Sequence, residues 1–465
     1  MQLGDIFDDF SFDARTASIE ITQVEIDSRK CIPGSIFFAL PGTSQNGSKF
    51  VKDAIANGAV CIVSSESLEL EVPVVTVSES LLRGLVVHAS SLVTGNPEQR
   101  CDLVGVTGTN GKTSVTSIVA DLAKALRWNS GNIGTLTNER TTPAAPELYR
   151  SIKTIVDTFD ADQPRGVVAL EVSSHAIDQG RIEGTEFAVV AFTNLSHDHL
   201  DYHGTMDEYF AAKAHLFTRE FSQRCVIWCD NSYGQQLADK TTLAVTEVRR
   251  SDASEIVQTL SGTTFFWRGH LVNTPLVGDY NVDNALMAMA ILSSLGASDN
   301  EIAGAMEFVS NVPGRFEIIP GKTVTAIVDY AHTPEGLRRL LTDVRSLSHS
   351  GRVICVFGCG GERDTSKRPE MGRVASQLSD VTIITSDNPR SESPDAIIDA
   401  VKSGCELDSA VYVQSDRRAA ISQAMQLANA GDVVVIAGKG HETTQIIGDV
   451  VLAFDDRVVA RELVK

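Results

Sequence analysis

The stretch Val104–Thr113, Val-Gly-Val-Thr-Gly-Thr-Asn-Gly-Lys-Thr, constrains the fold of this chain more than any other. Leu103–Val106 predicts a short buried strand, and Lys112–Leu126 predicts a helix with apolar residues on one face. Glycines in the turn between them let backbone N–H groups close around phosphate oxygens at the helix N-terminus. The stretch therefore predicts a strand–loop–helix phosphate site, although Val106 stands where the strict motif has glycine.

Two side chains give this loop its chemistry. Lys112 can reach the β- and γ-phosphates of a nucleotide, and the Thr113 hydroxyl can hold Mg²⁺. The alternative is a glycine-rich turn that carries Lys-Thr by chance. The candidate nucleotide-binding residues of the loop are Gly108, Thr109, Asn110, Gly111, Lys112 and Thr113.

Length and charge narrow the classes of protein. The 465 residues predict about three domains. No run of about 18 apolar residues occurs and the first ten residues are acidic, so we expect no membrane insertion, no secretion and a cytoplasmic location. A net charge of -20 argues against nucleic acid as a partner. The eight scattered cysteines predict reduced, packed thiols rather than zinc ligands or disulfides.

We expect an α/β protein of three domains: a smaller N-terminal α/β domain over residues 1–85, a central domain with the phosphate loop over 86–313, and a C-terminal doubly wound domain over 314–465. Val312–Arg315, Val-Pro-Gly-Arg, predicts the second boundary as a hinge. Two polar turns of the first domain, at 27–29 and 42–47, favour binding over chemistry. Ordinary surface turns are the alternative.

Polar clusters follow two predicted strands of the central domain. Gly166–Leu170 leads into Glu171, and Phe187–Phe192 leads into the cluster Thr193–Asp201. In open parallel sheets, ligands collect at the carboxyl ends of strands, so both clusters should lie at the same edge as the phosphate loop. Glu171 and His199 are therefore candidate Mg²⁺ ligands.

For three sets of central-domain residues, spacing in the sequence gives an interpretation but does not decide their role. The three histidines of 197–203 could hold zinc, although carboxylates are interleaved and no thiolate is near. Lys213, on the predicted helix Met206–Phe217, reads as a solvated side chain. Asn281 and Asn284 could cap the helix predicted over Ala285–Leu295, or they could contact a base edge.

In the C-terminal domain, strands are predicted at Val324–Val328, Arg352–Phe357, Val381–Thr385 and Asp432–Ala437. Each ends in a polar loop that carries glycine or proline. This pattern indicates a second doubly wound domain with its own binding edge. Two such edges facing each other predict a cleft between the domains.

Seven motifs, in the same order over nearly the whole chain, resemble those of the Mur ligase family, which makes peptidoglycan precursors. They are Val-Thr-Gly-Thr-Asn-Gly-Lys-Thr, Glu-Val-Ser-Ser-His, Thr-Asn-Leu-Ser-His-Asp-His-Leu-Asp-Tyr-His-Gly, Asp-Tyr-Ala-His-Thr-Pro, Phe-Gly-Cys-Gly-Gly-Glu-Arg-Asp, Asp-Asn-Pro-Arg and Ala-Gly-Lys-Gly-His-Glu. Within the family the resemblance is to the tripeptide-forming members. It implies an N-terminal domain that binds the UDP-sugar, a central P-loop-type ATPase domain and a C-terminal Rossmann-like domain that binds the amino acid. The implied activity is that of an ATP- and Mg²⁺-dependent amide ligase, which joins meso-diaminopimelate to UDP-N-acetylmuramoyl-L-alanyl-D-glutamate through an acyl phosphate and acts as a monomer in cell-wall synthesis.

The resemblance also assigns residues by position. It implies that Lys112, Glu171, His199 and a carbamylated Lys213 are catalytic, and that Thr113, Glu171, His199 and Lys213 hold the metal. Implied nucleotide contacts are Asn281, Asn284, Arg315 and Asp329. Implied UDP-sugar-peptide contacts are Ser28, Thr43, Ser44, Thr141, Thr142, Ser174, Gln179 and Arg181, of which those at 43–46 depart from the family pattern. Implied amino-acid contacts are Arg363, Asp387, Asn388, Pro389, Arg390, Gly438 and Glu442.

Amino-acid specificity is expected to rest on Arg390. A guanidinium that pairs with the distal carboxylate of diaminopimelate is worth about 1.5–3 kcal/mol, enough to reject lysine about tenfold or more. The alternative is that Arg390 pairs with the acidic surface.

Two rival functions are a ligase resembling folylpolyglutamate synthetases, which place the phosphate loop near the chain start, and a nucleotide-gated binding protein without synthesis.

Overall fold

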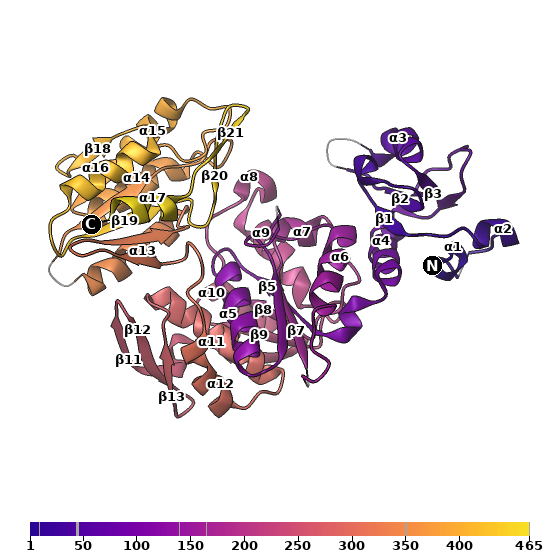
Figure 1. The fold of residues 1–465 in the computed structure, drawn as a ribbon, viewed down its shortest axis with the longest axis horizontal. Coiled ribbons are helices and arrows are strands. Elements are labelled where there is room, and N and C mark those ends of the chain that lie inside the picture. The colour runs from indigo at the N-terminus through magenta and orange to yellow at the C-terminus, as the bar shows by residue number, and fades with distance from the viewer. Residues whose placement is uncertain (9, 43–45, 139, 164, 349–350, 465) are drawn as a thin grey trace.

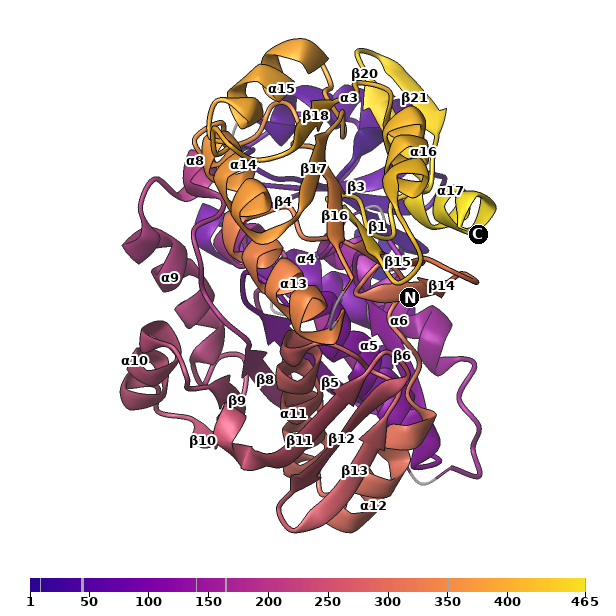
Figure 2. The ribbon, with the colours of Figure 1, turned by 90° about the vertical axis from the view of Figure 1, so that its left-hand side faces the viewer.

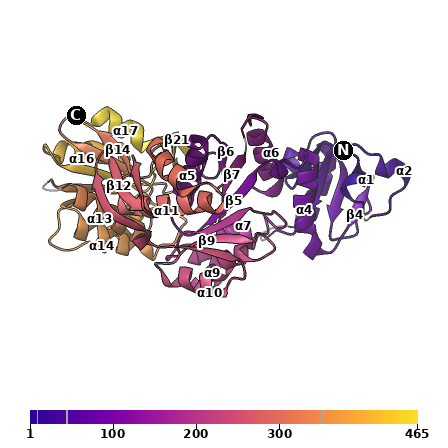
Figure 3. The same cartoon turned by 90° about the horizontal axis from the view of Figure 1, so that it is seen from below.

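The structure, a computed structural model, describes residues 1–8, 10–42, 46–138, 140–163, 165–348 and 351–464. The chain forms three α/β parts in a row, with the N-terminal part at one end and the C-terminal part at the other (Figures 1 and 3). This arrangement confirms the expected fold class. Among the described helices, none is long and apolar enough to cross a membrane.

The N-terminal part is built on a small parallel sheet of order β1-β2-β3-β4. Its elements are α1 (Leu3–Ile6), α2 (Ala14–Ala17), β1 (Gln23–Glu25), β2 (Ser35–Ala39), α3 (Val51–Ala56), β3 (Ala59–Ser64) and β4 (Val74–Thr76). The long helix α4 (Glu79–Thr94) follows and packs against both β1 and α6 of the next domain. The predicted boundary between residues 85 and 86 lies inside α4, so its exact position stays a prediction.

The central domain has a six-stranded parallel sheet of order β10-β9-β8-β5-β7-β6. Apolar residues alternate between its faces: Val104 and Val106 pack with α5 and α11, whereas Leu103 packs with α6. The strands are β5 (Asp102–Thr107), β6 (Asn129–Ile133), β7 (Gly166–Glu171), β8 (Val189–Phe192), β9 (Arg224–Trp228) and β10 (Ala244–Val248). The helices are α5 (Lys112–Ala125), α6 (Ala145–Val156), α7 (Ser174–Asp178), α8 (Leu200–His203), α9 (Met206–Ala214), α10 (Ser232–Lys240), α11 (Asp279–Ser294) and α12 (Asp299–Ala305).

A second, antiparallel sheet lies beside α11 and α12 (Figure 2) and contacts α11 near both of its ends, through Gln258 with Asp279 and Arg268 with Ser293. It consists of β11 (Ala253–Thr259), β12 (Gly262–Trp267) and β13 (His270–Thr274). Phe265, Trp267 and Val272 are buried beneath it and join the core around α11. This three-stranded sheet therefore packs against α11.

The C-terminal domain is doubly wound, as predicted. Its sheet has the order β14-β15-β19-β16-β17-β18, parallel except for the edge strand β14. Helices α13, α14 and α15 cover one face and α16 and α17 the other. The strands are β14 (Glu317–Pro320), β15 (Thr325–Asp329), β16 (Val353–Phe357), β17 (Val381–Ile384), β18 (Val411–Val413) and β19 (Val433–Ala437). The helices are α13 (Pro334–Leu347), α14 (Lys367–Leu378), α15 (Pro394–Lys402), α16 (Arg417–Leu427) and α17 (Asp456–Leu463).

One further element was not predicted. Strands β20 (Thr444–Ile447) and β21 (Val450–Ala453) form a separate two-stranded hairpin after β19. It lies at the rim of the C-terminal domain (Figure 1).

The eight cysteines are all free thiols, six of them buried, as the packed-thiol interpretation predicted.

The hinge between the central and C-terminal domains is a close backbone crossing. A Cβ on Gly314 (φ 64°) would lie 2.1 Å from the backbone nitrogen of His441, and a Cβ on Gly440 would lie 2.6 Å from the carbonyl oxygen of Gly314. Such separations are far below van der Waals contact, so both positions need glycine. The hinge thereby touches the loop that follows β19.

Candidate functional site

A cavity of about 1080 Å³ lies between the central and C-terminal domains. Lys112 of the phosphate loop and Arg390 of the C-terminal domain both line it. The two strand-end edges therefore face one shared cleft, as the sequence predicted. The site residues that line it are Thr109, Asn110, Gly111, Lys112, Thr113, Thr141, Glu171, His199, Asn284, Arg315, Asp329, Arg363, Asp387, Asn388, Arg390, Gly438 and Glu442.

The phosphate loop depends on two glycines. A Cβ on Gly108 (φ 147°) would lie 1.9 Å from Thr193 Oγ1, and a Cβ on Gly111 (φ 87°) would lie 2.6 Å from Asn284 Oδ1. Lys112 Nζ donates to the carbonyl oxygens of Gly108 and Thr109, both at 2.9 Å. Burial lowers the pKa of this lysine, an effect opposed by Glu171 and Asp198. The Lys112 side chain thus folds back over the loop and hydrogen-bonds to its carbonyl oxygens.

Thr193 and Asn194, at the end of β8, hold the loop from the side. The backbone N–H of Thr109 donates to Asn194 O at 2.9 Å, that of Asn110 donates to Asn194 Oδ1 at 3.0 Å, and the Thr193 hydroxyl donates to Asn110 O at 2.6 Å. Sequence reasoning gave these residues no role. Their position at the carboxyl end of a predicted strand, at the same edge as the phosphate loop, could have indicated that they contact the loop.

Glu171 and Thr113 form a set of oxygen donors beside the loop. The Thr113 hydroxyl donates to Glu171 Oε2 at 2.9 Å, and Thr135 donates to the same carboxylate from its backbone N–H at 2.8 Å and its hydroxyl at 3.2 Å. Gly134 admits the carboxylate, because a Cβ there would lie 2.1 Å from Glu171 Oε1. Hard oxygen ligands of this kind suit Mg²⁺. Thr135 was missed by the sequence reasoning.

His199 lies close to a carboxylate that the sequence reasoning did not assign. His199 Nε2 lies 3.5 Å from Asp198 Oδ2, and burial lowers the pKa of His199 to about 3. A neutral imidazole can act as a metal ligand. Among the described residues, no group of three or more His, Cys, Asp or Glu side chains is placed to hold a metal ion, so the zinc alternative gains no support.

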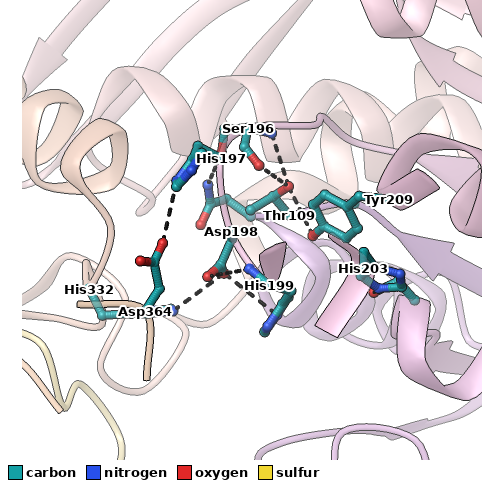
Figure 4. Close-up of polar contacts among 12 residues, drawn as sticks. Thr109, Ser196, His197, Asp198, His199, His203, Tyr209, His332 and Asp364 are labelled. Atoms are coloured by element: carbon teal, nitrogen blue, oxygen red, sulfur yellow. Dashed lines mark hydrogen bonds and ion pairs between the residues drawn. The ribbon is translucent and has the colours of Figure 1, made fainter. Parts of the chain in front are cut away.

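Two histidine–aspartate pairs cross the cleft (Figure 4). His332 Nε2, from the C-terminal domain, lies 3.9 Å from Asp198 Oδ2, and His197 Nδ1 lies 3.7 Å from Asp364 Oδ2. Burial opposes ionisation of Asp198, but His199, His332 and Lys367 lower the pKa of Asp198 to about 2. No motif could have predicted these pairs, because each joins two domains.

Lys213 is not a solvated side chain, so the interpretation from spacing alone was wrong. It is 1% exposed, and its Nζ donates to Gly108 O at 3.0 Å and lies 4.8 Å from the ring centre of Tyr209. Burial, and next the nearby Lys112 ammonium, lower its pKa well below the usual value. Helix α9 thus places a readily deprotonated amine directly behind the phosphate loop.

Asn281 and Asn284 do not cap a helix, because α11 begins earlier, at Asp279 after Gly278. Asn281 Nδ2 donates to Val277 O at 2.8 Å, and Asn284 Nδ2 donates to Asn281 Oδ1 at 3.3 Å. Of the two, Asn284 lines the cleft. The capping alternative is therefore wrong, and contact with a bound ligand stays a prediction.

Arg315 and Asp329 organise the hinge side of the cleft. Arg315 NH2 lies 3.4 Å from Thr113 Oγ1, and its guanidinium carbon lies 4.1 Å from the ring centre of Tyr330. Asp329 accepts hydrogen bonds from the Tyr280 hydroxyl and the Phe316 N–H, each at 2.7 Å. These contacts join α11, the hinge and β15.

A pocket of polar side chains surrounds Arg390. Asn388 Nδ2 donates to Glu442 Oε2 at 2.9 Å, and Lys439 Nζ, which is fully buried, donates to the same oxygen at 2.8 Å. Arg390 NH1 donates to the carbonyl of Gly361 at 2.7 Å. Within the described residues this guanidinium pairs with carbonyl oxygens and with no carboxylate, so nothing supports the surface-pairing alternative. Lys439 was quoted in a motif but given no role.

Other predicted site residues lie outside the cleft lining. Four of them are not among the residues that line the cleft: Gly108, Lys213, Asn281 and Pro389. Ser28 is buried in the first domain. Arg181 donates from NH1 to Thr142 O at 3.0 Å and from NH2 to Gln179 Oε1 at 2.6 Å, while Ser174 Oγ lies 2.9 Å from His203 Nε2. Arg83 of α4 donates to Gln179 O, so this cluster lies toward the first domain. Thr43 and Ser44 fall outside the described residues.

Three models of known protein families match successive parts of this chain. Residues 106–292 match the Mur ligase middle domain, 314–440 match the Mur ligase glutamate ligase domain, and 20–103 match the Mur ligase catalytic domain. This chain belongs to the Mur ligase family. As a member it is a ligase, and its parallel-sheet domains are those of the family's known structures.

Several curated relatives are similar over nearly their whole length. A protein of Gloeobacter violaceus named UDP-N-acetylmuramoyl-L-alanyl-D-glutamate–2,6-diaminopimelate ligase is 41% identical, with 99% of this chain and 98% of the relative covered. A Geobacillus kaustophilus protein of the same name is 44% identical, with 96% and 95% covered. A solved structure of a ligase with that name superposes with a TM-score of 0.69 at 30% identity, covering 100% of this chain and 98% of the other.

Proposed function

We propose that this Mur ligase uses ATP to join meso-diaminopimelate to UDP-N-acetylmuramoyl-L-alanyl-D-glutamate in peptidoglycan synthesis, as the names of its relatives indicate for those proteins. The observation that carries the proposal is the shared cleft, which Lys112 enters from one domain and Arg390 from the other. A phosphoryl donor and an amino acid can therefore meet there.

The chemistry needs an activated carboxyl group. A carboxylate oxygen of the glutamyl residue attacks the γ-phosphorus of ATP, ADP leaves, and an acyl phosphate forms. The amine of diaminopimelate then attacks the acyl carbon, the C–O bond to phosphate breaks, and the amine loses a proton as the amide forms. Bringing two anions together costs electrostatic energy, which fixed cations such as Lys112 and Arg315 offset in the cleft.

Glu171, Thr113 and His199 are the residues proposed to hold Mg²⁺, on the basis of their donor atoms. When bound, the metal supplies charge neutralisation at the β- and γ-phosphates. Lys213 is proposed to be carbamylated: burial lowers the pKa of its amine and so favours the neutral form, which reacts with CO₂ and loses a proton. The product would place an anion behind the phosphate loop, where it can bind a second metal ion.

The proposed roles of the three domains follow their positions. The first domain, with Ser28, is proposed to bind the UDP moiety, and the cluster around Arg181 and Gln179 lies along the route from that domain to the cleft. Arg390 is proposed to bind the distal carboxylate of diaminopimelate, and Glu442 an ammonium group. The folded α/β part before the phosphate loop counts against the folylpolyglutamate synthetase alternative, as expected.

A ligation assay with phosphate release as its readout tests the proposal. Phosphate should appear only when the UDP-muramoyl-dipeptide and meso-diaminopimelate are both present, and lysine should be a poor substitute. Arg390→Ala should raise the KM for diaminopimelate tenfold or more and leave that for ATP unchanged. Arg373→Ala, an exposed arginine on α14, is the matched control. Equal rates with lysine would refute the specificity.

Trapping with hydroxylamine separates synthesis from mere binding. With ATP and the UDP-muramoyl-dipeptide but no amino acid, a ligase forms an acyl phosphate that hydroxylamine converts to a hydroxamate. A nucleotide-gated binding protein would bind ATP and yield no hydroxamate.

A further inference from the structure

The backbone of Arg390 has a conformation that residues with a side chain rarely adopt. Its φ is 51°, in the left-handed region. This region is costly for a residue with a Cβ and persists only where the surrounding structure holds it. The direction of the Arg390 side chain therefore depends on whatever fixes its backbone.

The β20–β21 hairpin makes the contacts that fix it. The Arg390 N–H donates to Ile446 O at 3.1 Å, and the Gly448 N–H donates to Arg390 O at 2.7 Å, so both backbone groups of Arg390 pair with the hairpin. The Ile446 N–H donates to Asn388 Oδ1 at 3.0 Å. Strand β20 thus pairs with the Asp-Asn-Pro-Arg loop through backbone hydrogen bonds, as neighbouring β-strands do.

Gln445 adds a side-chain contact to the same loop. Its Nε2 donates to Asp387 O at 2.8 Å, and the side chain is 7% exposed. Gln445 is not among the residues that line the cleft. It can influence a bound amino acid only through the loop at 387–390.

The hairpin is not part of the six-stranded sheet of the C-terminal domain. It forms a two-stranded sheet of its own, and Val450, Val451 and Leu452 of β21 are 56%, 62% and 45% exposed. A two-stranded hairpin alone is marginally stable in water. The hairpin and the loop therefore order each other, and the hairpin's packing is directed at the amino-acid pocket.

We propose that the β20–β21 hairpin sets the position of Arg390, and that Gln445 is a positioning residue for amino-acid specificity. The inference rests on the proposed function, since it takes Arg390 as the group that binds the distal carboxylate. Loosening the hairpin releases the strained backbone of Arg390 and lets its guanidinium leave the geometry that a carboxylate needs.

Gln445→Met tests the side-chain contact, because methionine keeps the size and removes the donor without adding charge. The KM for meso-diaminopimelate should rise about three- to tenfold, the value expected for one lost hydrogen bond. The KM for ATP should stay unchanged, and the preference for diaminopimelate over lysine should fall. Thr444→Ala, the exposed neighbour on the same strand, should change none of these.

Gly448 provides a test that leaves Gln445 intact. Its φ is 58°, and no atom lies within 4 Å of a Cβ built there, so a substitution acts through backbone strain alone. Asparagine tolerates this conformation and β-branched residues do not. Gly448→Asn should keep the selectivity of the parent enzyme, whereas Gly448→Val should lose it in the same way as Gln445→Met.

The double variant Arg390→Ala/Gln445→Met decides whether Gln445 acts through Arg390. If it does, Gln445→Met has no further effect on the KM for diaminopimelate once Arg390 is gone. Additive effects, or an equal rise in the KM for ATP, would overturn the inference while the function stands. If Arg390→Ala itself leaves the KM for diaminopimelate unchanged, the proposed role of Arg390 fails instead. Melting temperatures of all variants identify any that are merely unfolded.

Discussion

Arg315 reaches from the hinge to the start of the phosphate-loop helix, where its NH2 lies 3.4 Å from Thr113 Oγ1. The guanidinium also stacks on Tyr330 of the C-terminal domain. One side chain thus contacts the nucleotide edge of the central domain and the first loop beyond β15. A movement between the two domains changes the contact with Thr113.

Replacing Arg315 by alanine should weaken nucleotide binding. A charge-assisted contact is worth about 1.5–3 kcal/mol, so the KM for ATP should rise roughly tenfold or more. Arg315→Lys keeps the charge but loses the planar stacking on Tyr330, and it should recover only part of the loss. Steady-state kinetics with ATP varied provide the measurement. An unchanged KM for ATP in Arg315→Ala would show that the residue has only a hinge role.

Glu171→Gln should impair metal use. The amide keeps one of the two acceptor oxygens that Thr113 and Thr135 use and loses the negative charge that favours binding of a divalent cation. The Mg²⁺ concentration for half-maximal activity should rise by an order of magnitude or more. Glu186→Gln, an exposed position before β8, is the control. A normal Mg²⁺ titration in Glu171→Gln would exclude this carboxylate as a ligand.

Carbamylation of Lys213 should be visible directly. Enzyme kept with ¹³C-bicarbonate should show one carbamate carbon by NMR, and Lys213→Ala should lack it. Activity of the alanine variant should be low and partly restored by a short-chain carboxylate, which can occupy the vacated space. A spectrum without a carbamate signal, together with a fully active alanine variant, would contradict the proposal.

Two neighbouring ion pairs between α16 and α17 predict very different effects on stability. Arg417 and Asp456 are fully buried, with NH2 and Oδ2 2.7 Å apart, whereas Arg418 and Glu462 form an exposed pair. Asp456→Ala leaves a buried cation unpaired and should cost about 3–5 kcal/mol. Glu462→Ala should cost about 1 kcal/mol or less. Thermal unfolding of both variants compares them, and equal melting temperatures would show that burial does not matter here.

Sequence patterns predicted what depends on local chain geometry. The strand, loop and helix around Lys112 were found within a residue of their ends, because apolar periodicity and glycine spacing are local signals. The capping alternative for Asn281 failed because α11 begins at Asp279, directly after Gly278 with its φ of 97°, and so starts before the first residue of the apolar pattern at Ala285. The hairpin after β19 was missed because its exposed apolar residues obey no burial pattern.

Tertiary contacts account for the remaining misses. Tyr209 and the phosphate loop set the environment of Lys213. Gly108 of that loop lies more than 100 residues before Lys213 in the sequence. The pair Asp198 and His332 exists only because two domains meet. Side-chain burial and contacts between domains cannot be read from spacing, so only the resemblance to a family pointed to Lys213 at all.

The glycine crossing at the hinge has a mechanical consequence. Because the chain at 314 rests directly on the chain at 440, the segments that carry Arg315 and Glu442 must move together. A rotation between the two domains therefore carries both side chains in the same direction relative to Thr113 of the central domain. Arg315 and Glu442 keep their separation while their distance to the phosphate-loop helix changes.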